Sequence, residues 1–226
     1  MGRISYQKKF AVKINAPTLL SKELRQRARK KEYGFIALSS ATEPWMRAEK
    51  DYKVTRKCLE VISMFKFPVH CLTKSTLILR DLDLLEEIDK KAILPADLKL
   101  NRGVLITISL STLDDDTAKI FEPNAPRPKD RLEVLQAVKN EGFRAGIAYI
   151  PVLPFISDCQ LEDMIKTAKD FEADYVFVGA LSLYAKDIYY RVLEKHYPEL
   201  LPKYCQLFNC LLYTSDAADE LDGVDL

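Results

Sequence analysis

The sequence predicts an α/β protein with parallel strands, organised as a partial (β/α)6 barrel of the TIM type. Short apolar runs alternate along the chain with amphipathic segments of helical periodicity. These runs are apolar at nearly every position, which is typical of parallel strands covered by helices. The first predicted helix has no strand before it. We therefore expect a barrel whose first strand, with the loop that follows it, is missing.

Five apolar runs are predicted as strands. They are GFIALSS (34–40), FPVHCLTK (67–74), GVLITISLST (103–112), RAGIAYIPVLPF (144–155) and DYVFVGAL (174–181). Pro68 is tolerable only because it stands near the start of its strand.

The segments between the strands are predicted as helices. They are 15–31, 48–65, 75–92, a split helical segment over 114–142, 157–173 and 186–200. Ser75, and either Ser157 or Asp158, are expected to cap helix starts, and Gly142 to end a helix. Segment 48–65 is expected to be one helix with these residues inward: Tyr52, Cys58, Leu59 and Ile62.

The totals are those of a soluble globular protein, with 48% hydrophobic and 30% charged residues among 226. No apolar run approaches the roughly 18 residues of a membrane span, so we expect no membrane partner. Five cysteines without zinc or cluster spacing predict free thiols in the cytoplasm. Residues 1–31 hold ten Lys or Arg and one acid, Glu23. Such an excess fits either a solvated helix face or attraction of phosphate.

Polar side chains gather where the predicted strands end, and in a parallel barrel these ends form one rim. The residues are Ser39, Ser40, Lys74, Ser109, Ser111 and Tyr149. A lysine among hydroxyls suits a small carboxylate or phosphate. The alternatives are a solvent-exposed loop lysine, turn chemistry for the serines, and core packing for Tyr149 and Trp45. Glu122 stands in a Pro-rich loop and is either part of a rigid turn or a further group facing the site.

Several segments together resemble the radical SAM proteins related to spore photoproduct lyase. They include "ALSSATEPWMRAEKDYKVTRKCLEV", "FPVHCLTKSTLILRDLDLL" and "ITISLSTLDDDTAKIFEPNAPRPKDRLEVLQAV". The resemblance covers nearly all of residues 10–208. It implies a barrel in which a 4Fe–4S cluster reduces S-adenosylmethionine, and the resulting 5′-deoxyadenosyl radical abstracts hydrogen from a substrate. An external electron donor would serve the complete enzyme.

The resemblance also implies roles for the rim residues. Ser39 or Ser40 would meet the amino or carboxylate end of the methionine moiety, and Lys74 would pair with its carboxylate. Ser109 would contact carboxylate or ribose, and Tyr149 would lie near the adenosine. No catalytic residue and no metal ligand is assigned in this chain.

The sequence departs from that pattern in its cysteines. The three-cysteine motif CxxxCxxC, which holds the cluster in relatives, occurs nowhere, and no hydrogen-donor cysteine stands near Ser40. We therefore expect an N-terminally truncated radical SAM core that is inactive as it stands. Residues 1–209 would be this core. Residues 210–226, with "CLLYTSDAADELDGVDL", resemble the translation of a sequencing adapter and would be a non-native tail.

Two other functions fit the same residues. One is a β/α-barrel enzyme without a cluster that uses the Lys74 and serine rim for a carboxylate or phosphate. The other is a nucleic-acid-binding protein that uses the basic N-terminal helix, whose DNA binding would be lost on charge reversal at Arg25, Arg27 and Arg29. The substrate is not indicated by any motif.

Overall fold

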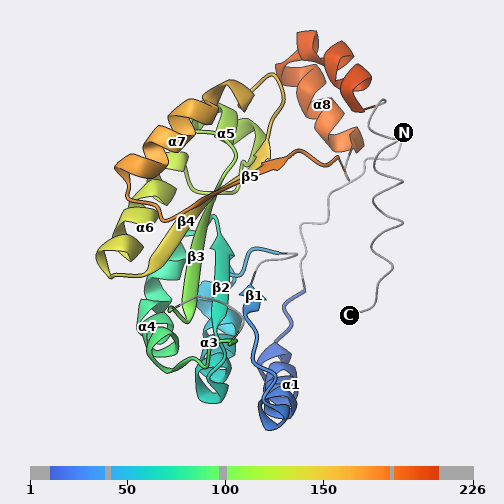
Figure 1. The fold of residues 1–226 in the computed structure, drawn as a ribbon. Helices are drawn as coiled ribbons and strands as arrows, with labels where there is room; N and C mark the ends of the chain where they lie inside the picture. Colours follow the sequence, from blue (N-terminus) through green and yellow to red (C-terminus); the bar gives the residue numbers. More distant parts are fainter. Residues whose placement is uncertain (1–10, 39–41, 97–100, 184–185, 209–226) are drawn as a thin grey trace.

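The computed structural model contains one sheet of five parallel strands, which lie side by side in chain order (Figure 1). The structure describes residues 11–38, 42–96, 101–183 and 186–208. The strands are β1 (Ile36–Leu38), β2 (Val69–Thr73), β3 (Val104–Leu110), β4 (Arg144–Val152) and β5 (Val176–Ala180). The predicted α/β class and parallel sheet are confirmed, and the architecture is that of a partial TIM-like barrel. The predicted tail, 210–226, lies outside the described residues.

After α1, which precedes the first strand, helices and strands alternate as in βα units. They are α1 (Ala16–Lys30), α2 (Glu49–Tyr52), α3 (Val54–Phe65), α4 (Leu82–Lys91), α5 (Asp115–Phe121), α6 (Pro128–Asn140), α7 (Leu161–Asp170) and α8 (Lys186–His196). Three short 3-10 turns, η1 (Thr76–Asp81), η2 (Asp158–Gln160) and η3 (Pro198–Leu200), accompany them. None of the helices in the described ranges is long and apolar enough to cross a membrane.

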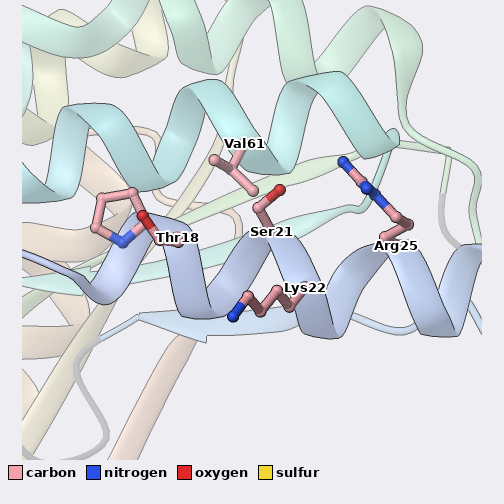
Figure 2. A pocket seen from close by; sticks show the side chains of 6 residues that line it. Thr18, Ser21, Lys22, Arg25 and Val61 are labelled. Carbon is pink, nitrogen blue, oxygen red and sulfur yellow. The ribbon is translucent and has the colours of Figure 1, made fainter.

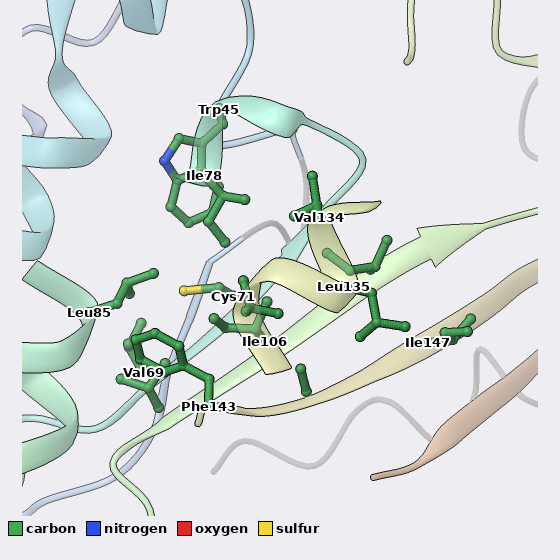
Figure 3. Packing of buried hydrophobic residues seen from close by; sticks show 14 of the residues in the cluster. Trp45, Val69, Cys71, Ile78, Leu85, Ile106, Val134, Leu135, Phe143 and Ile147 are labelled. Carbon is green, nitrogen blue, oxygen red and sulfur yellow. The ribbon is translucent and has the colours of Figure 1, made fainter. Parts of the chain in front are cut away.

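The main core lies between the sheet and the helices on one of its faces (Figure 3). Val69 and Cys71 of β2 and Ile106 of β3 pack in one cluster with Leu85 of α4 and Leu135 of α6, and all five are fully buried. The expected burial of both sheet faces holds along most of β3. In β2, by contrast, buried residues alternate with half-buried ones.

The segment predicted as one helix over 48–65 is instead two helices. Lys53 has a left-handed backbone conformation, with φ 51° and ψ 38°, and it ends α2 and begins α3. This turn points Tyr52 outward, where it is 48% exposed, so its predicted inward position was wrong. Leu59 and Ile62 of α3 are fully buried, as predicted.

Two of the predicted helix signals are confirmed. The Ser75 hydroxyl accepts a hydrogen bond from the Leu77 N–H at 3.2 Å, which caps η1. Gly142 has φ 79° after α6, a conformation that favours glycine. The predicted cap by either Ser157 or Asp158 was wrong, because neither η2 nor α7 has a side-chain cap. The Ser157 hydroxyl accepts from the Leu153 N–H, and the Asp158 carboxylate accepts from the N–H of the next residue, Cys159.

The last helices form a second, smaller apolar cluster beyond the carboxyl end of β5 (Figure 1). Residues 201–208 are helical and contribute Tyr204 and Phe208, which pack with Leu193 of α8. The ring of Phe121 at the end of α5 lies 5.4 Å from that of Tyr189, so this cluster is attached to the barrel through α5.

A chain of polar contacts crosses the half-buried face of the sheet. His70 Nε2 lies 2.7 Å from the Thr107 hydroxyl, which in turn lies 2.9 Å from the Tyr175 hydroxyl. Burial lowers the pKa of His70. Burial on the sheet therefore favours the neutral form of His70.

The lowered pKa of His70 makes stability depend on pH. Unfolded His70 binds a proton near its ordinary pKa of about 6.5, whereas the folded protein resists protonation until lower pH. We expect the free energy of unfolding to fall as the pH is lowered through that value. His70→Gln should flatten the dependence, measured by urea unfolding at several pH values, whereas His196→Gln on the exposed end of α8 should not. A steeper fall in His70→Gln would contradict this account.

Candidate functional site

The candidate site is the carboxyl edge of the sheet, where all five strands end on the same side. The register pairs Leu38 with Cys71 and Thr73 with Ile108, so the segments that follow β1, β2 and β3 start from one edge. Ser39 and Ser40, the predicted ligands after β1, lie outside the described residues. Their roles stay predictions.

Glu43 ties the loop after β1 to the end of β2. One carboxylate oxygen accepts hydrogen bonds from the Thr73 hydroxyl and the Trp45 N–H, and the other accepts from the Lys74 N–H at 2.8 Å. The two carboxylate oxygens of Glu43 thus hold the backbone of Trp45 and Lys74 and the side chain of Thr73 at the carboxyl edge of the sheet. Thr73 and Lys74 are distant from Glu43 in the sequence, so only the folded chain shows these contacts.

Trp45 is part of the core rather than an open wall of the site. Its side chain is 1% exposed, and its indole N–H donates to Asp81 at 2.8 Å. Asp81 also accepts from Arg56 at 2.9 Å and from Arg80 at 2.7 Å. Burial alone would raise the pKa of Asp81, but the hydrogen bonds from Arg80, Arg56 and Trp45 outweigh it and lower that pKa. Asp81 therefore stays charged and anchors the base of the loop.

A row of alternating charges crosses the edge from β2 to α6. The Lys74 ammonium lies 3.1 Å from Glu122 Oε1, and Glu122 Oε2 lies 2.6 Å from Arg131 Nη2, an ion pair not aligned as a hydrogen bond. Exposure falls along the row, with 36% for the Lys74 side chain, 10% for Glu122 and 1% for Arg131. Lys74 is therefore the end that solvent, or a ligand, can reach.

Arg131 links this row to β3. Its guanidinium donates to the Ser109 carbonyl at 2.9 Å and to the Pro126 carbonyl at 2.7 Å. Lys74 and Ser109, predicted to share one rim, are thus connected through Glu122 and Arg131. The Ser109 residue itself is only 7% exposed, and it meets the row through its carbonyl.

Ser111 adds a buried polar group just after β3. The residue is 2% exposed, and its hydroxyl has no hydrogen-bond partner within the described part of the chain. Buried polar groups are nearly always paired with protein, water or ligand. This hydroxyl is therefore a position that an ordered water or a ligand would satisfy.

The Tyr149 side chain lies in the main core, although the residue pairs in register with Leu110, the last residue of β3. It is fully buried, and its hydroxyl donates to the Ser157 carbonyl. Burial raises the pKa of this phenol, so it is neutral. Core packing, the alternative considered for Tyr149, is therefore what the structure shows. The role of Tyr149 near an adenosine stays a prediction.

The described cysteines do not fit an iron–sulfur cluster. Cys71 is buried in the core, Cys58 is half-buried in α3, Cys159 is exposed before α7, and Cys205 is half-buried in the helical segment 201–208. Burial raises the pKa of Cys71 and that of Cys58, the latter to about 11. No group of three His, Cys, Asp or Glu within the described ranges could hold a metal ion. A cluster requires several thiolates in one place.

Arg131 was missed by the sequence reasoning, although a signal was present. Its side chain lies on the apolar side of α6 with Val134, Leu135 and Val138, all buried. An arginine at a position that helical periodicity assigns to the core needs a buried partner. Glu122, left open between a rigid turn and a site residue, is that partner.

The chain is similar in sequence to several uncharacterized proteins. No family model matches the chain. The uncharacterized protein Rv2578c of Mycobacterium tuberculosis is 27% identical over 207 residues, which cover 90% of this chain and 57% of that protein. The uncharacterized protein MJ0683 of Methanocaldococcus jannaschii is 28% identical over 189 residues, or 83% and 63%. The chain thus spans little more than half the length of these relatives.

Solved structures of SuiB from Streptococcus suis share the architecture. The structure bound to S-adenosylmethionine matches with a TM-score of 0.54 and 15% identity over 87% of this chain and 43% of that chain. The structure bound to precursor peptide SuiA gives 0.51 and 17% over 74% and 33%. At this level of identity the likeness is one of fold alone. The narrower resemblance to spore photoproduct lyase stays a prediction.

Proposed function

We propose that the chain is part of a radical SAM-type enzyme and binds S-adenosylmethionine at the carboxyl edge of its sheet. The observation that carries the proposal is the Lys74 ammonium, held at this edge by Glu122 and reachable from solvent. The likeness in fold to SuiB, one of whose structures is bound to S-adenosylmethionine, supports the choice of ligand.

The chemistry of Lys74 suits the carboxylate of the methionine moiety. A lysine ammonium has three N–H donors, and the Lys74 ammonium meets Glu122 as an ion pair, so donors remain for a ligand carboxylate. Glu122 also forms an ion pair with Arg131, so two cations share its single negative charge. The positive charge of Lys74 is therefore not fully neutralised by Glu122. The unpaired Ser111 hydroxyl provides a further polar group on the same edge.

The proposal stops at binding and orienting S-adenosylmethionine. The described cysteines are dispersed, and no reaction step is therefore assigned to a cluster in this part of the chain. The resemblance also implies a substrate that loses hydrogen and an external electron donor. Both would serve the complete enzyme. The four described cysteines are unpaired, which supports the cytoplasmic location that we propose with this function.

Titration calorimetry with S-adenosylmethionine tests the proposal. Lys74→Gln should weaken binding by about tenfold or more, because a charged hydrogen bond contributes about 1.5–3 kcal/mol. Lys90→Gln is the matched control, since Lys90 also pairs with a glutamate, Glu86, but on the exposed surface of α4. Its affinity should equal that of the parent chain.

Two results would overturn the assignment. One is an absence of S-adenosylmethionine binding by the parent chain, and the other is equal affinity in Lys74→Gln. The alternative function, a cluster-free enzyme that holds a carboxylate or phosphate at this edge, predicts a different outcome. Inorganic phosphate would then bind in a Lys74-dependent way while S-adenosylmethionine would not.

A further inference from the structure

The outer surface of α1 carries cations that have no acidic partner. The helix holds five Lys or Arg and one acid, Glu23, which pairs with Arg27 at 2.8 Å. Lys22, Arg25 and Arg29 are exposed and make no ion pair or hydrogen bond within the described part of the chain. Their spacing of three and four residues places them in one stripe along the helix.

Several exposed cations on the other helices have an acid close by on their own surface: Lys90 pairs with Glu86, Lys91 with Glu87, Lys119 with Asp116 and Arg127 with Asp130. Such pairs are the usual state of a solvated helix face. The three cations of the stripe on α1 have no such acidic partner within the described part of the chain.

The stripe borders a groove between α1 and α3 (Figure 2). The groove has a volume of about 410 Å³ and is lined by Pro17, Thr18, Ser21, Lys22, Arg25 and Val61. Figure 2 shows Ser21 and Arg25 extending from α1 toward α3, with Val61 across from Ser21. Hydroxyl and guanidinium groups together in a groove are suited to phosphate oxygens.

The apolar side of α1 is not available to a membrane. Leu24 is 1% exposed, and Leu20 and Ala28 pack against the main core. A helix that lies in a lipid interface needs this side free to enter the acyl region. The cations of α1 instead remain exposed on a helix that is already docked on the protein.

We propose that this stripe of Lys22, Arg25 and Arg29 binds the phosphate backbone of a nucleic acid. From Lys22 to Arg29 the helix rises roughly 10 Å at 1.5 Å per residue. A nucleic-acid strand places about three phosphates along that length at 3.4 Å per step. The stripe thus offers about one cation per phosphate. The site is separate from the carboxyl edge and does not depend on S-adenosylmethionine.

The test is fluorescence anisotropy with a labelled DNA duplex of about 20 base pairs at a series of salt concentrations beginning near 50 mM. Two triple variants of the full chain are compared. One replaces the stripe (Lys22→Gln, Arg25→Gln, Arg29→Gln). The other replaces paired cations on α4 and α5 (Lys90→Gln, Lys91→Gln, Lys119→Gln). Both lower the net charge by the same amount, so they differ only in where the charge is lost.

We expect the stripe variant to bind about tenfold or more weakly, with the slope of log K against log salt reduced by about 2 to 3. The control variant should stay within about twofold of the parent, and both should keep the parent's circular dichroism spectrum and S-adenosylmethionine affinity. Equal losses in the two variants would show only a net-charge effect and would overturn the proposal. So would a parent chain that binds no DNA, or one that binds anionic phospholipid vesicles in its place.

Discussion

Asp81→Ala is expected to lower the free energy of unfolding by about 3–5 kcal/mol, a large share of the stability of an ordinary domain. The Asp81 side chain is fully buried and accepts hydrogen bonds from Trp45, Arg56 and Arg80. Without it, a buried indole N–H loses its acceptor and two guanidinium groups lose their shared counter-charge. Urea unfolding followed by Trp45 fluorescence would measure the loss.

Asp83→Ala is the matched control for this prediction. Asp83 pairs with the same Arg56 at 2.7 Å, but its side chain is 59% exposed. An exposed pair contributes at most about 1 kcal/mol, so this variant should be close to the parent. Equal destabilisation by the two alanines would show that burial of Asp81 is not the source of its effect.

The pair of Arg131 and Glu122 is expected to give the second largest effect. Arg131→Met removes a buried cation from Glu122 and removes the donors to the Ser109 and Pro126 carbonyls. The expected loss is about 3 kcal/mol, since an unpaired buried charge is costly. Glu122→Gln should also destabilise, because Arg131 then loses its counter-charge.

The double variant decides whether the two residues act as a pair. Adding Glu122→Gln to Arg131→Met should cost less than the sum of the single losses, with a coupling free energy of about 1–3 kcal/mol. Arg127 and Asp130 form an exposed pair at the start of the same helix, and the same cycle there should show no measurable coupling. Additive losses for Arg131 and Glu122 would contradict the ion pair.

The local parts of the fold could be predicted from the sequence because they depend on neighbours along the chain. The apolar runs around Val69 and Ile106 specified buried strands, and the helical segments between them required parallel pairing. Ser75 and Gly142 marked a helix start and a helix end through their own backbone preferences. The gathering of Lys74 and Ser109 at one edge followed from strand direction alone.

The sequence by itself therefore determined the class of the fold, the direction of its strands and the edge at which its polar groups meet. Only the tertiary structure decided which of those groups are partnered. It placed Glu122 between Lys74 and Arg131, bound Glu43 to the end of β2, and turned Tyr149 into the core. The physical reason is range. Periodicity and capping act over a few residues, whereas charge pairing and burial depend on which distant segments packing brings together, and a single left-handed residue such as Lys53 redirects the side chains around it.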